Sequence, residues 1–253
     1  MTYALVHGAG RMAGRILANL PEFPDYELAG IVSRTRRGDD TADWFPSLEH
    51  IQKPVDLLID FTLPGGTRTA AQWCALNGTA LLSGTTGLTD EDIKALQDAA
   101  LKVPVLWAPN LSRGVALTAA LVRQTAEALE GHTKINITDI HHIHKVDAPS
   151  GTALALASAV MEGRSRRLQG LTEAGRGEEL SANDDGEPVF SSVREGEVIG
   201  EHTVSFVLAD EEIEITHKAI SRDVFARGAL KAGEWLVSQK AGYYSTSDWL
   251  GLG

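Results

Sequence analysis

The sequence predicts an α/β protein with two domains: a parallel, doubly wound sheet, then an α+β domain with a mixed, largely antiparallel sheet. Two patterns indicate this. Short apolar strands alternate with helical stretches through the first hundred residues, which is typical of a parallel sheet covered on both faces. After residue 111 the alternation stops, and three closely spaced β-rich segments follow late in the chain.

Composition limits the class of protein. The chain has 253 residues, 43% of them hydrophobic and 23% charged, which is ordinary for a globular protein. A net charge of −11 argues against a nucleic-acid partner, because phosphate binding needs clustered Lys and Arg. No apolar run approaches the roughly 18 residues of a membrane span, so we expect no membrane association. Cys74 alone cannot form an intrachain disulfide, and we expect it to be buried in a cytoplasmic protein.

The first half of the chain supplies the elements of the parallel sheet. We expect strands at 3–7, 28–32, 56–61, 79–83 and 103–108, with helices ending at 20 and covering 67–76 and 89–101. The strand at 56–61 is almost continuously apolar, as a strand buried on both faces should be. Thr89 is placed to cap the third helix, since three acidic residues follow it in the positive first turn.

The second half changes character. We expect helices at 115–130 and 151–161, a strand at 134–142, a polar loop at 162–187 and a last helix at 225–239. Strands at 189–194, 198–208 and 212–217 are separated by short polar turns, which favours antiparallel pairing among them. The domain boundary is expected near residue 112.

A glycine-rich turn follows the first strand and opens the first helix. Gly8 permits the tight turn, Gly10 lets the backbone approach a pyrophosphate, and Ala13 or Gly14 allows close helix packing. Arg11 and Met12 begin the helix, whose N–H groups and positive potential favour phosphate. In this context the turn predicts a Rossmann-type dinucleotide site, against the alternative of a merely structural turn.

The end of the second strand bears on which dinucleotide is used. Where NAD-binding folds place a carboxylate for the ribose hydroxyls, this chain has Ser33 and Arg34, followed by Thr35, Arg36 and Arg37. Hydroxyl and guanidinium groups can bind a 2′-phosphate that a carboxylate would repel. We therefore expect NADPH to be accepted at least as well as NADH. Further backbone and hydroxyl donors are expected at two other strand ends, Asp60-Phe61-Thr62 and Gly84-Thr85-Thr86-Gly87.

The segment from His141 to Thr152 is the richest in titratable groups. Three histidines and a lysine occur within 141–145, and if the strand continued, His141 and His142 would point to opposite faces. Ser150-Gly151-Thr152 opens a helix and offers N–H groups and hydroxyls to a carboxylate, with Lys145 adding positive charge. An anion cradle beside a proton donor suits reduction of a carboxylate substrate.

Other interpretations of this segment remain. A zinc site from His141, His142 and His144 is disfavoured, because neighbouring strand residues diverge and no cysteine joins them, so no metal is assigned. Each histidine taken singly is more often a satisfied structural residue.

The same segment, His-His-x-His-Lys-x-Asp-Ala-Pro-Ser-Gly-Thr-Ala-Leu, resembles the signature of the dihydrodipicolinate reductase family, also called 4-hydroxy-tetrahydrodipicolinate reductase. The similarity covers most of the chain and is poorest at 162–187. It includes Gly84-Thr85-Thr86-Gly87, Ala108-Pro109-Asn110-Leu111-Ser112, Gly200-Glu201-His202-Thr203-Val204, Glu214-Ile215-Thr216-His217, Ser221-Arg222, Gly242-Tyr243-Tyr244 and Asp248-Trp249-Leu250.

This resemblance implies a function and its residues. The reaction would be reduction of 4-hydroxy-tetrahydrodipicolinate, a small dicarboxylate, to tetrahydrodipicolinate by NADPH or NADH, in diaminopimelate and lysine biosynthesis. His141 would be the general acid/base, and Lys145 the proton donor or orienting cation. The substrate would contact His142, Ser150, Gly151 and Thr152. The cofactor would contact Gly8, Gly10, Arg11, Met12, Ser33, Arg34, Phe61, Thr62, Gly84, Thr85, Thr86, Ala108, Asn110, Leu111 and Arg222.

The resemblance also implies an assembly and a domain layout. Family members form homotetramers through the sheet of the second domain, and their last helix returns to the first. The dinucleotide-binding domain would then be 1–111 with 222–253, and the substrate-binding and oligomerisation domain 112–221.

Two departures from the family pattern stand out. The glycines of the first turn are redistributed, and Leu111 replaces a common aromatic residue, which would loosen packing on the nicotinamide. Two rival functions stay open: another two-domain NAD(P)-dependent amino-acid or oxo-acid dehydrogenase, and a non-catalytic dinucleotide sensor.

Overall fold

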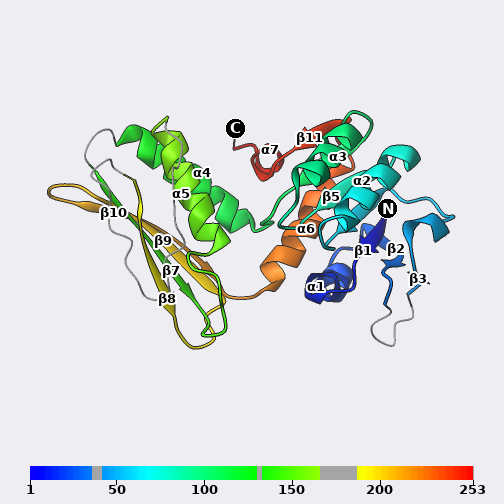
Figure 1. Ribbon diagram of the computed structural model, residues 1–253, viewed down its shortest axis with the longest axis horizontal. Coiled ribbons are helices and arrows are strands. Elements are labelled where there is room, and N and C mark those ends of the chain that lie inside the picture. Colours follow the sequence, from blue (N-terminus) through cyan, green and yellow to red (C-terminus); the bar gives the residue numbers. More distant parts are fainter. Residues whose placement is uncertain (36–41, 130–132, 166–186, 253) are drawn as a thin grey trace. The chain divides into compact units, whose positions relative to one another are not determined.

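The computed structural model describes residues 1–35, 42–129, 133–165 and 187–252, and the chain divides into two compact units (Figure 1). The first unit is Met1–Arg113 with Asp223–Gly253, and the second is Gly114–Arg222. The chain therefore passes between the units twice, at 113–114 and at 222–223. No helix in the described part of the chain is long and apolar enough to cross a membrane.

The first unit is built on a seven-stranded sheet in which every neighbouring pair is parallel. The strand order is β11-β6-β5-β4-β1-β2-β3. The strands are β1 (Thr2–His7), β2 (Tyr26–Val32), β3 (Trp44–Phe45), β4 (Leu57–Asp60), β5 (Ala80–Ser83), β6 (Pro104–Trp107) and β11 (Gly242–Tyr244). The predicted parallel sheet is confirmed, and the short edge strands β3 and β11 are additions that their two- and three-residue lengths hid from pattern analysis.

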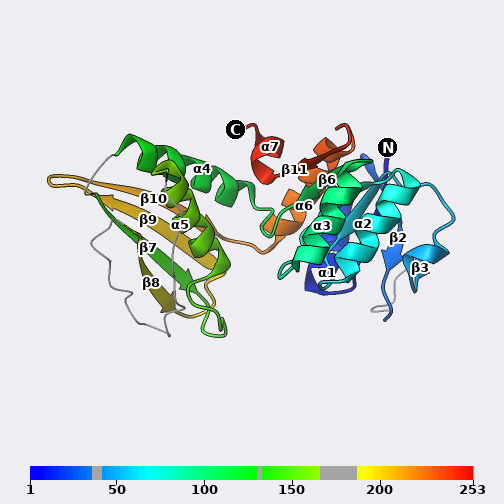
Figure 2. The ribbon, with the colours of Figure 1, turned by 45° about the horizontal axis from the view of Figure 1, so that its top comes forward.

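Helices cover both faces of this sheet (Figure 2). One apolar core joins the strands to α1 (Arg11–Asn19) and α6 (Asp223–Leu236), and a second joins them to α2 (Gly66–Asn77) and α3 (Asp90–Ala100). Successive strand residues feed opposite cores, as Ala4 and Leu5 do on β1. Cys74 is fully buried in the second core, as predicted. The first unit also contains two 3₁₀ turns, Leu20–Glu22 and Leu48–His50, and the short helix α7 (Thr246–Leu250).

The start of α3 shows how local sequence fixes a helix end. The Thr89 side chain accepts from the Asp92 N–H, and the Asp92 carboxylate accepts in return from the Thr89 N–H. This reciprocal capping satisfies two backbone donors that the helix itself cannot pair. The predicted cap is confirmed.

The second unit is a four-stranded mixed sheet with both of its helices on one face (Figure 1). The strands are β7 (Lys134–His141), β8 (Val189–Arg194), β9 (Gly200–Val207) and β10 (Glu212–Ala219), and the helices are α4 (Arg113–Ala128) and α5 (Gly151–Gly163). The helices and strands share one core, which includes Val122, Leu156, Ile137, Phe190 and Phe206.

The predicted antiparallel run of the last three strands is only half right. The order is β10-β9-β7-β8, so β9 pairs antiparallel with β10, whereas β8 lies at the far edge, parallel to β7. Strands two places apart are separated by about 9.6 Å, which the connection at 195–199 can span. That connection passes the end of β7, where the Glu195 N–H donates to the His141 carbonyl. A short turn therefore did not imply a hairpin.

Two further expectations need qualification. Helix α5 runs to Gly163, two residues past its predicted end. The predicted polar loop at 162–187 otherwise falls mostly outside the described residues, as do Arg36 and Arg37.

Candidate functional site

The first unit has a pocket of about 530 Å³ formed by the turns after β1, β4, β5 and β6 and by the start of α6. Ligands of open parallel sheets bind at this edge, where the carboxyl ends of the strands meet. The lining residues are Gly10, Arg11, Met12, Phe61, Thr62, Gly84, Thr85, Thr86, Ala108, Pro109, Asn110, Leu111 and Phe225.

Most residues that the sequence assigned to the cofactor therefore share one pocket. Pro109 and Phe225 also line it, although sequence reasoning did not select them. Phe225 follows the return of the chain from the second unit, a long-range neighbour that the glycine motif cannot reveal. Of the other assigned residues, Gly8, Ser33, Arg34 and Arg222 are not among the lining residues.

Gly8 and Gly10 set the backbone path of the turn beside the pocket. Gly8 has φ +115°, and a Cβ there would lie 2.6 Å from the Phe61 carbonyl oxygen, so only glycine fits. A Cβ at Gly10 would meet open space, which leaves room for a ligand to approach the backbone. Ala13, rather than Gly14, packs α1 on the sheet, because Ala13 is buried and Gly14 is exposed.

The N-terminus of α1 fits a phosphate group. Gly10 occupies the N-cap position and makes no side-chain cap hydrogen bond to the first turn. Arg11 and Met12 then line the pocket. Backbone N–H groups at a helix start, with the positive end of its dipole, form a ready anion site.

Asp60 ties the turns of this pocket together. Its carboxylate is fully buried at the end of β4, and its Oδ1 lies 3.0 Å from Nδ1 of His7 on β1. Four hydroxyl groups donate to it over 2.7–3.0 Å, those of Thr62, Thr67, Ser83 and Thr85. Burial alone would raise the pKa of Asp60, but His7 and the hydroxyls of Thr67 and Thr62 outweigh it and lower the pKa.

The second strand ends at the same edge. β1 and β2 are parallel neighbours with His7 opposite Val32, and the Gly8 N–H donates to the Val32 carbonyl. Ser33 and Arg34 follow directly. They therefore lie beside the glycine turn, outside the pocket itself.

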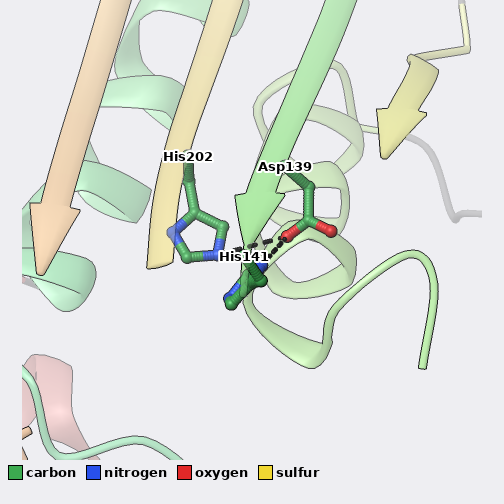
Figure 3. A group of neighbouring side chains, drawn as sticks. All are labelled: Asp139, His141 and His202. Carbon is green, nitrogen blue, oxygen red and sulfur yellow. Dashed lines mark ion pairs between the residues drawn. The ribbon is translucent and has the colours of Figure 1, made fainter. Parts of the chain in front are cut away.

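The second unit places His141 in a buried polar cluster (Figure 3). Nδ1 of His141 lies 3.0 Å from Oδ1 of Asp139, two residues earlier on β7. Nε2 of His202, on β9, lies 3.5 Å from the same oxygen. Nη1 of Arg194, on β8, lies 3.1 Å from Oδ2 of Asp139. Burial would raise the pKa of Asp139, but its contacts with His141, Ser150 and Arg194 lower it well below the usual range.

Strand β7 ends at His141, so the alternation expected for the following histidines does not apply. The chain turns there, with the Lys145 N–H donating to the His142 carbonyl. His142 is half-buried and His144 is exposed, with ring centroids 6.1 Å apart. Burial, then the charge of Arg222, lowers the pKa of His142. Nζ of Lys145 lies 2.7 and 2.8 Å from the two carboxylate oxygens of Asp147.

The start of α5 is fastened to the cluster through Ser150. Its hydroxyl caps the helix by accepting from the Ala153 N–H, and it lies 3.2 Å from Nε2 of His202. The Ser150 N–H donates to Oδ2 of Asp139 at 3.3 Å. Gly151 is exposed and Thr152 half-buried on the first turn of the helix.

Comparison with known proteins agrees with this architecture in both units. Residues 2–111 match the family model described as dihydrodipicolinate reductase, N-terminus, and residues 114–250 match the one described as dihydrodipicolinate reductase, C-terminus. A 4-hydroxy-tetrahydrodipicolinate reductase of Zymomonas mobilis is 40% identical over 98% of this chain and 96% of its own. One of Chromohalobacter salexigens is 45% identical over 98% of each.

The chain belongs to the dihydrodipicolinate reductase family. A solved structure, the dipicolinate-bound dihydrodipicolinate reductase from Paenisporosarcina sp. TG-14, has a TM-score of 0.81 at 22% identity, covering 98% of this chain and 99% of that one. That likeness supports the fold. As a member of the family, the chain is an NAD(P)H-dependent oxidoreductase.

Sequence reasoning found the histidine segment of this reductase but missed its surroundings. Asp139 lies two residues before His141 on the same face of β7, and strand pairing sets it opposite His202 and Ser192. The available signal was a carboxylate on the side of the strand that the buried Ile135 and Ile137 also occupy. His202 and Arg194 became neighbours only through the strand order, which the sequence did not reveal.

The protonation of His202 gives a test of this cluster by pH. Burial, offset in part by Asp139 and reinforced by His141, His217 and Lys145, lowers the pKa of His202 to about 4. An unfolded chain takes up that proton near pH 6.5, so the folded state should lose stability as pH falls from 6.5 towards 4. For this group alone the loss between pH 7 and pH 5 is about 2 kcal/mol.

We expect His202→Gln to remove this share of the acid destabilisation. The free energy of unfolding, measured in urea at pH 7 and pH 5, should fall less for the variant than for the native chain. The exposed His50→Gln serves as the control and should keep the native difference. An unchanged difference in His202→Gln would show that His202 is protonated in the folded state.

Proposed function

We propose that this chain reduces 4-hydroxy-tetrahydrodipicolinate to tetrahydrodipicolinate with NADPH or NADH, in diaminopimelate and lysine biosynthesis. The observation that carries the proposal is the segment 141–152, which contains a buried imidazole, a lysine on the following turn and a helix N-terminus. Full-length similarity to relatives named for this reaction supports it.

The first unit would hold the dinucleotide, which supplies the hydride when it is bound. The N–H groups of the first turn of α1 would bind the pyrophosphate. Phe61, Thr62, the 84–86 turn and 108–111 would surround the nicotinamide half, since they line the rest of the pocket. Ser33 and Arg34 would contact the adenosine ribose and its 2′-phosphate, because they follow β2 at the same edge. Gly8 would support the turn from the side of the Phe61 carbonyl rather than contact the cofactor. Arg222 stays an expected contact of the cofactor.

The second unit would hold the substrate's two carboxylates. The exposed first turn of α5 offers Gly151 and Thr152, and its dipole favours an anion. Lys145 and His142 lie on the turn between β7 and α5 and complete the set. Ser150 would support these residues from below, since its hydroxyl already caps the helix. The carboxylate that Lys145 binds would compete with Asp147 for its ammonium group.

The reaction needs one proton overall, in addition to the hydride. Loss of water removes the 4-hydroxyl group and a proton from the neighbouring carbon, so this step consumes no proton overall, and hydride then adds to the conjugated carbon. The enamine carbon that results takes up one proton from an acid on the protein. His141 and Lys145 are the proposed donors, since general acids must lie within hydrogen-bond reach of the group they protonate.

One assay separates this function from its rivals. We expect NADPH absorbance to fall when the purified chain receives the product of dihydrodipicolinate synthase, and pyridine-2,6-dicarboxylate to inhibit the reaction. With both cofactors, kcat/KM for NADPH should at least equal that for NADH, given Ser33 and Arg34. Binding of NADPH without oxidation would identify a sensor, and oxidation only with amino or oxo acids would identify another dehydrogenase.

Lys145 should act in the chemical step rather than in cofactor binding. Lys145→Ala should lower kcat by about 10²-fold or more, the usual contribution of general acid catalysis, and leave the NADPH Kd within twofold. Lys94→Ala, which removes another ion-paired lysine, should keep the native kcat. A kcat within threefold of native in Lys145→Ala would refute the assignment.

We also propose that the chain forms a homotetramer through the sheet of the second unit. In the described part of the chain both helices of this unit lie on one face of the sheet (Figure 2). Across the other face, strand pairing aligns Ser191, Thr138, Thr203 and Thr216 in one uncharged row. The same face also carries charged residues such as Glu201 and Glu214, so this uncharged row is the part of the face best suited to self-association.

Introducing charge into this row should disrupt the assembly. Thr138→Arg should sediment as a smaller species than the native chain, for which we expect four times the mass of one chain. Leu76→Arg, at an exposed position on α2, should sediment as the native chain does. A tetramer that survives Thr138→Arg unchanged would place the interface elsewhere.

A further inference from the structure

Asp139 is a fully buried carboxylate to which the proposed chemistry gives no role. It has 0% exposed surface. An ionised carboxylate in such a place is costly unless other groups compensate its charge. Arg194 supplies a positive charge 3.1 Å from Oδ2, and the Ser150 N–H and Ser192 hydroxyl also donate to this oxygen at 3.3 and 3.4 Å.

The two oxygens of Asp139 have different partners. Oδ2 accepts from Arg194, Ser150 and Ser192, all of which can only donate to it in this arrangement. Oδ1 faces Nδ1 of His141 at 3.0 Å, and neither of these two buried atoms makes a hydrogen bond to another described group. The nearest partner of Oδ1 is thus the His141 imidazole, with Nε2 of His202 farther away at 3.5 Å.

The other side of the His141 ring is also fixed. A Cβ at Gly200 would lie 2.9 Å from Nε2 of His141, so the β9 backbone closely bounds that edge of the ring. His202 meets the ring edge to face, with centroids 5.0 Å apart. The imidazole is therefore held in one orientation by Asp139, Gly200 and His202.

We infer that Asp139 is a positioning residue for the reduction: it keeps the proton of neutral His141 on Nδ1, leaves Nε2 to exchange protons with the substrate, and anchors the start of α5 beside it. This inference rests on the proposed role of His141. A carboxylate selects the tautomer because it can only accept, so the nitrogen that faces it carries the hydrogen.

A metal site is the competing interpretation of this cluster. Ligand atoms of Asp139, His141 and His202 lie within 4.8 Å of one another. The guanidinium of Arg194 argues against a divalent cation, because it already places a positive charge against the same carboxylate. The Ser150 N–H also donates a hydrogen bond to Oδ2, so only Oδ1 would be open to a metal ion.

The amide variant Asp139→Asn gives a specific tautomer prediction. Because Oδ2 receives three donors, the amide oxygen must stay there, and the NH₂ group must turn towards His141. Nδ1 then has to accept, so the proton moves to Nε2. Spectra of histidine labelled with ¹⁵N should show protonated Nδ1 in the native chain and protonated Nε2 in the variant, with the His141 signal identified by its loss in His141→Asn.

The kinetic readout uses a double-variant cycle. Asp139→Asn should lower kcat by about 10²-fold or more, while the NADPH Kd and the midpoint of thermal unfolding stay near their native values. The double variant, which combines Asp139→Asn and His141→Asn, should have the same kcat as His141→Asn alone. The basic limb of the pH profile of kcat should also move in Asp139→Asn. The other charged and titratable groups around this cluster are Arg194, His202, His217 and Lys145. Asp56→Asn, a carboxylate-to-amide change in the first unit, should keep the native kcat.

The outcomes separate the inference from the function beneath it. If His141→Asn keeps kcat within threefold, the acid/base assignment itself fails. If His141→Asn is impaired but Asp139→Asn is not, or if the two losses add in the double variant, the positioning role is wrong. Loss of native activity after dialysis against a chelator, restored by Zn²⁺, would also overturn it in favour of a metal site.

Discussion

Each unit of this reductase depends on one buried carboxylate at the end of a central strand. Asp60 ends β4, and Asp139 lies near the end of β7; both are fully buried. Their surroundings are alike in an unexpected way. Strand pairing sets Asp60 between His7 and Ser83, and it sets Asp139 between His202 and Ser192. In both units, therefore, a carboxylate has an imidazole on one neighbouring strand and a hydroxyl on the other.

This arrangement follows from the cost of burying charge. A carboxylate removed from water must be surrounded by donors, and those donors are then held in place by it. Asp60 collects hydroxyls from the turns that line the cofactor pocket, such as Thr62 and Thr85. Asp139 collects the Ser150 N–H at the start of α5. Loops that carry function are thereby tied to the rigid ends of strands.

The two carboxylates differ in what balances them. Asp60 relies on four hydroxyls and His7, so it acts as a fastening point within the first unit. Asp139 has a permanent cation, Arg194, in addition to its imidazoles. The second cluster can therefore gain or lose a proton at a histidine without leaving the carboxylate uncompensated. That property suits a site of proton transfer.

Much of the fold was predictable because it follows local patterns. The alternation of apolar strands and helices gave the parallel sheet, and Thr89 with its acidic neighbours gave a helix start to the residue. The failures arose where the outcome depends on pairing between distant segments. Nothing local distinguishes a five-residue turn that closes a hairpin from one that crosses the end of β7, so the sequence pattern does not predict the place of β8 in the sheet.

The same limit applies to the site. Residues close in sequence, from His141 to Thr152, could be assigned together because one turn holds them. Asp139 was overlooked although it lies only two residues away, since a carboxylate on a strand is usually an exposed one. His202 and Arg194 come from β9 and β8, and only the strand order brings them to Asp139. Strand alternation would have shown that Asp139 and His141 share a face.

Charge balance in the second unit connects the buried cluster with the proposed substrate. Asp139 and Arg194 compensate each other, and the lowered pKa of His202 keeps that ring neutral at pH 7. Asp139 therefore has no unbalanced negative charge that would repel an anion at the end of β7. The two carboxylates of the substrate would approach from the start of α5, where the helix N-terminus and Lys145 supply positive charge. The buried carboxylate could then position the imidazole without weakening the attraction between the enzyme and the dicarboxylate.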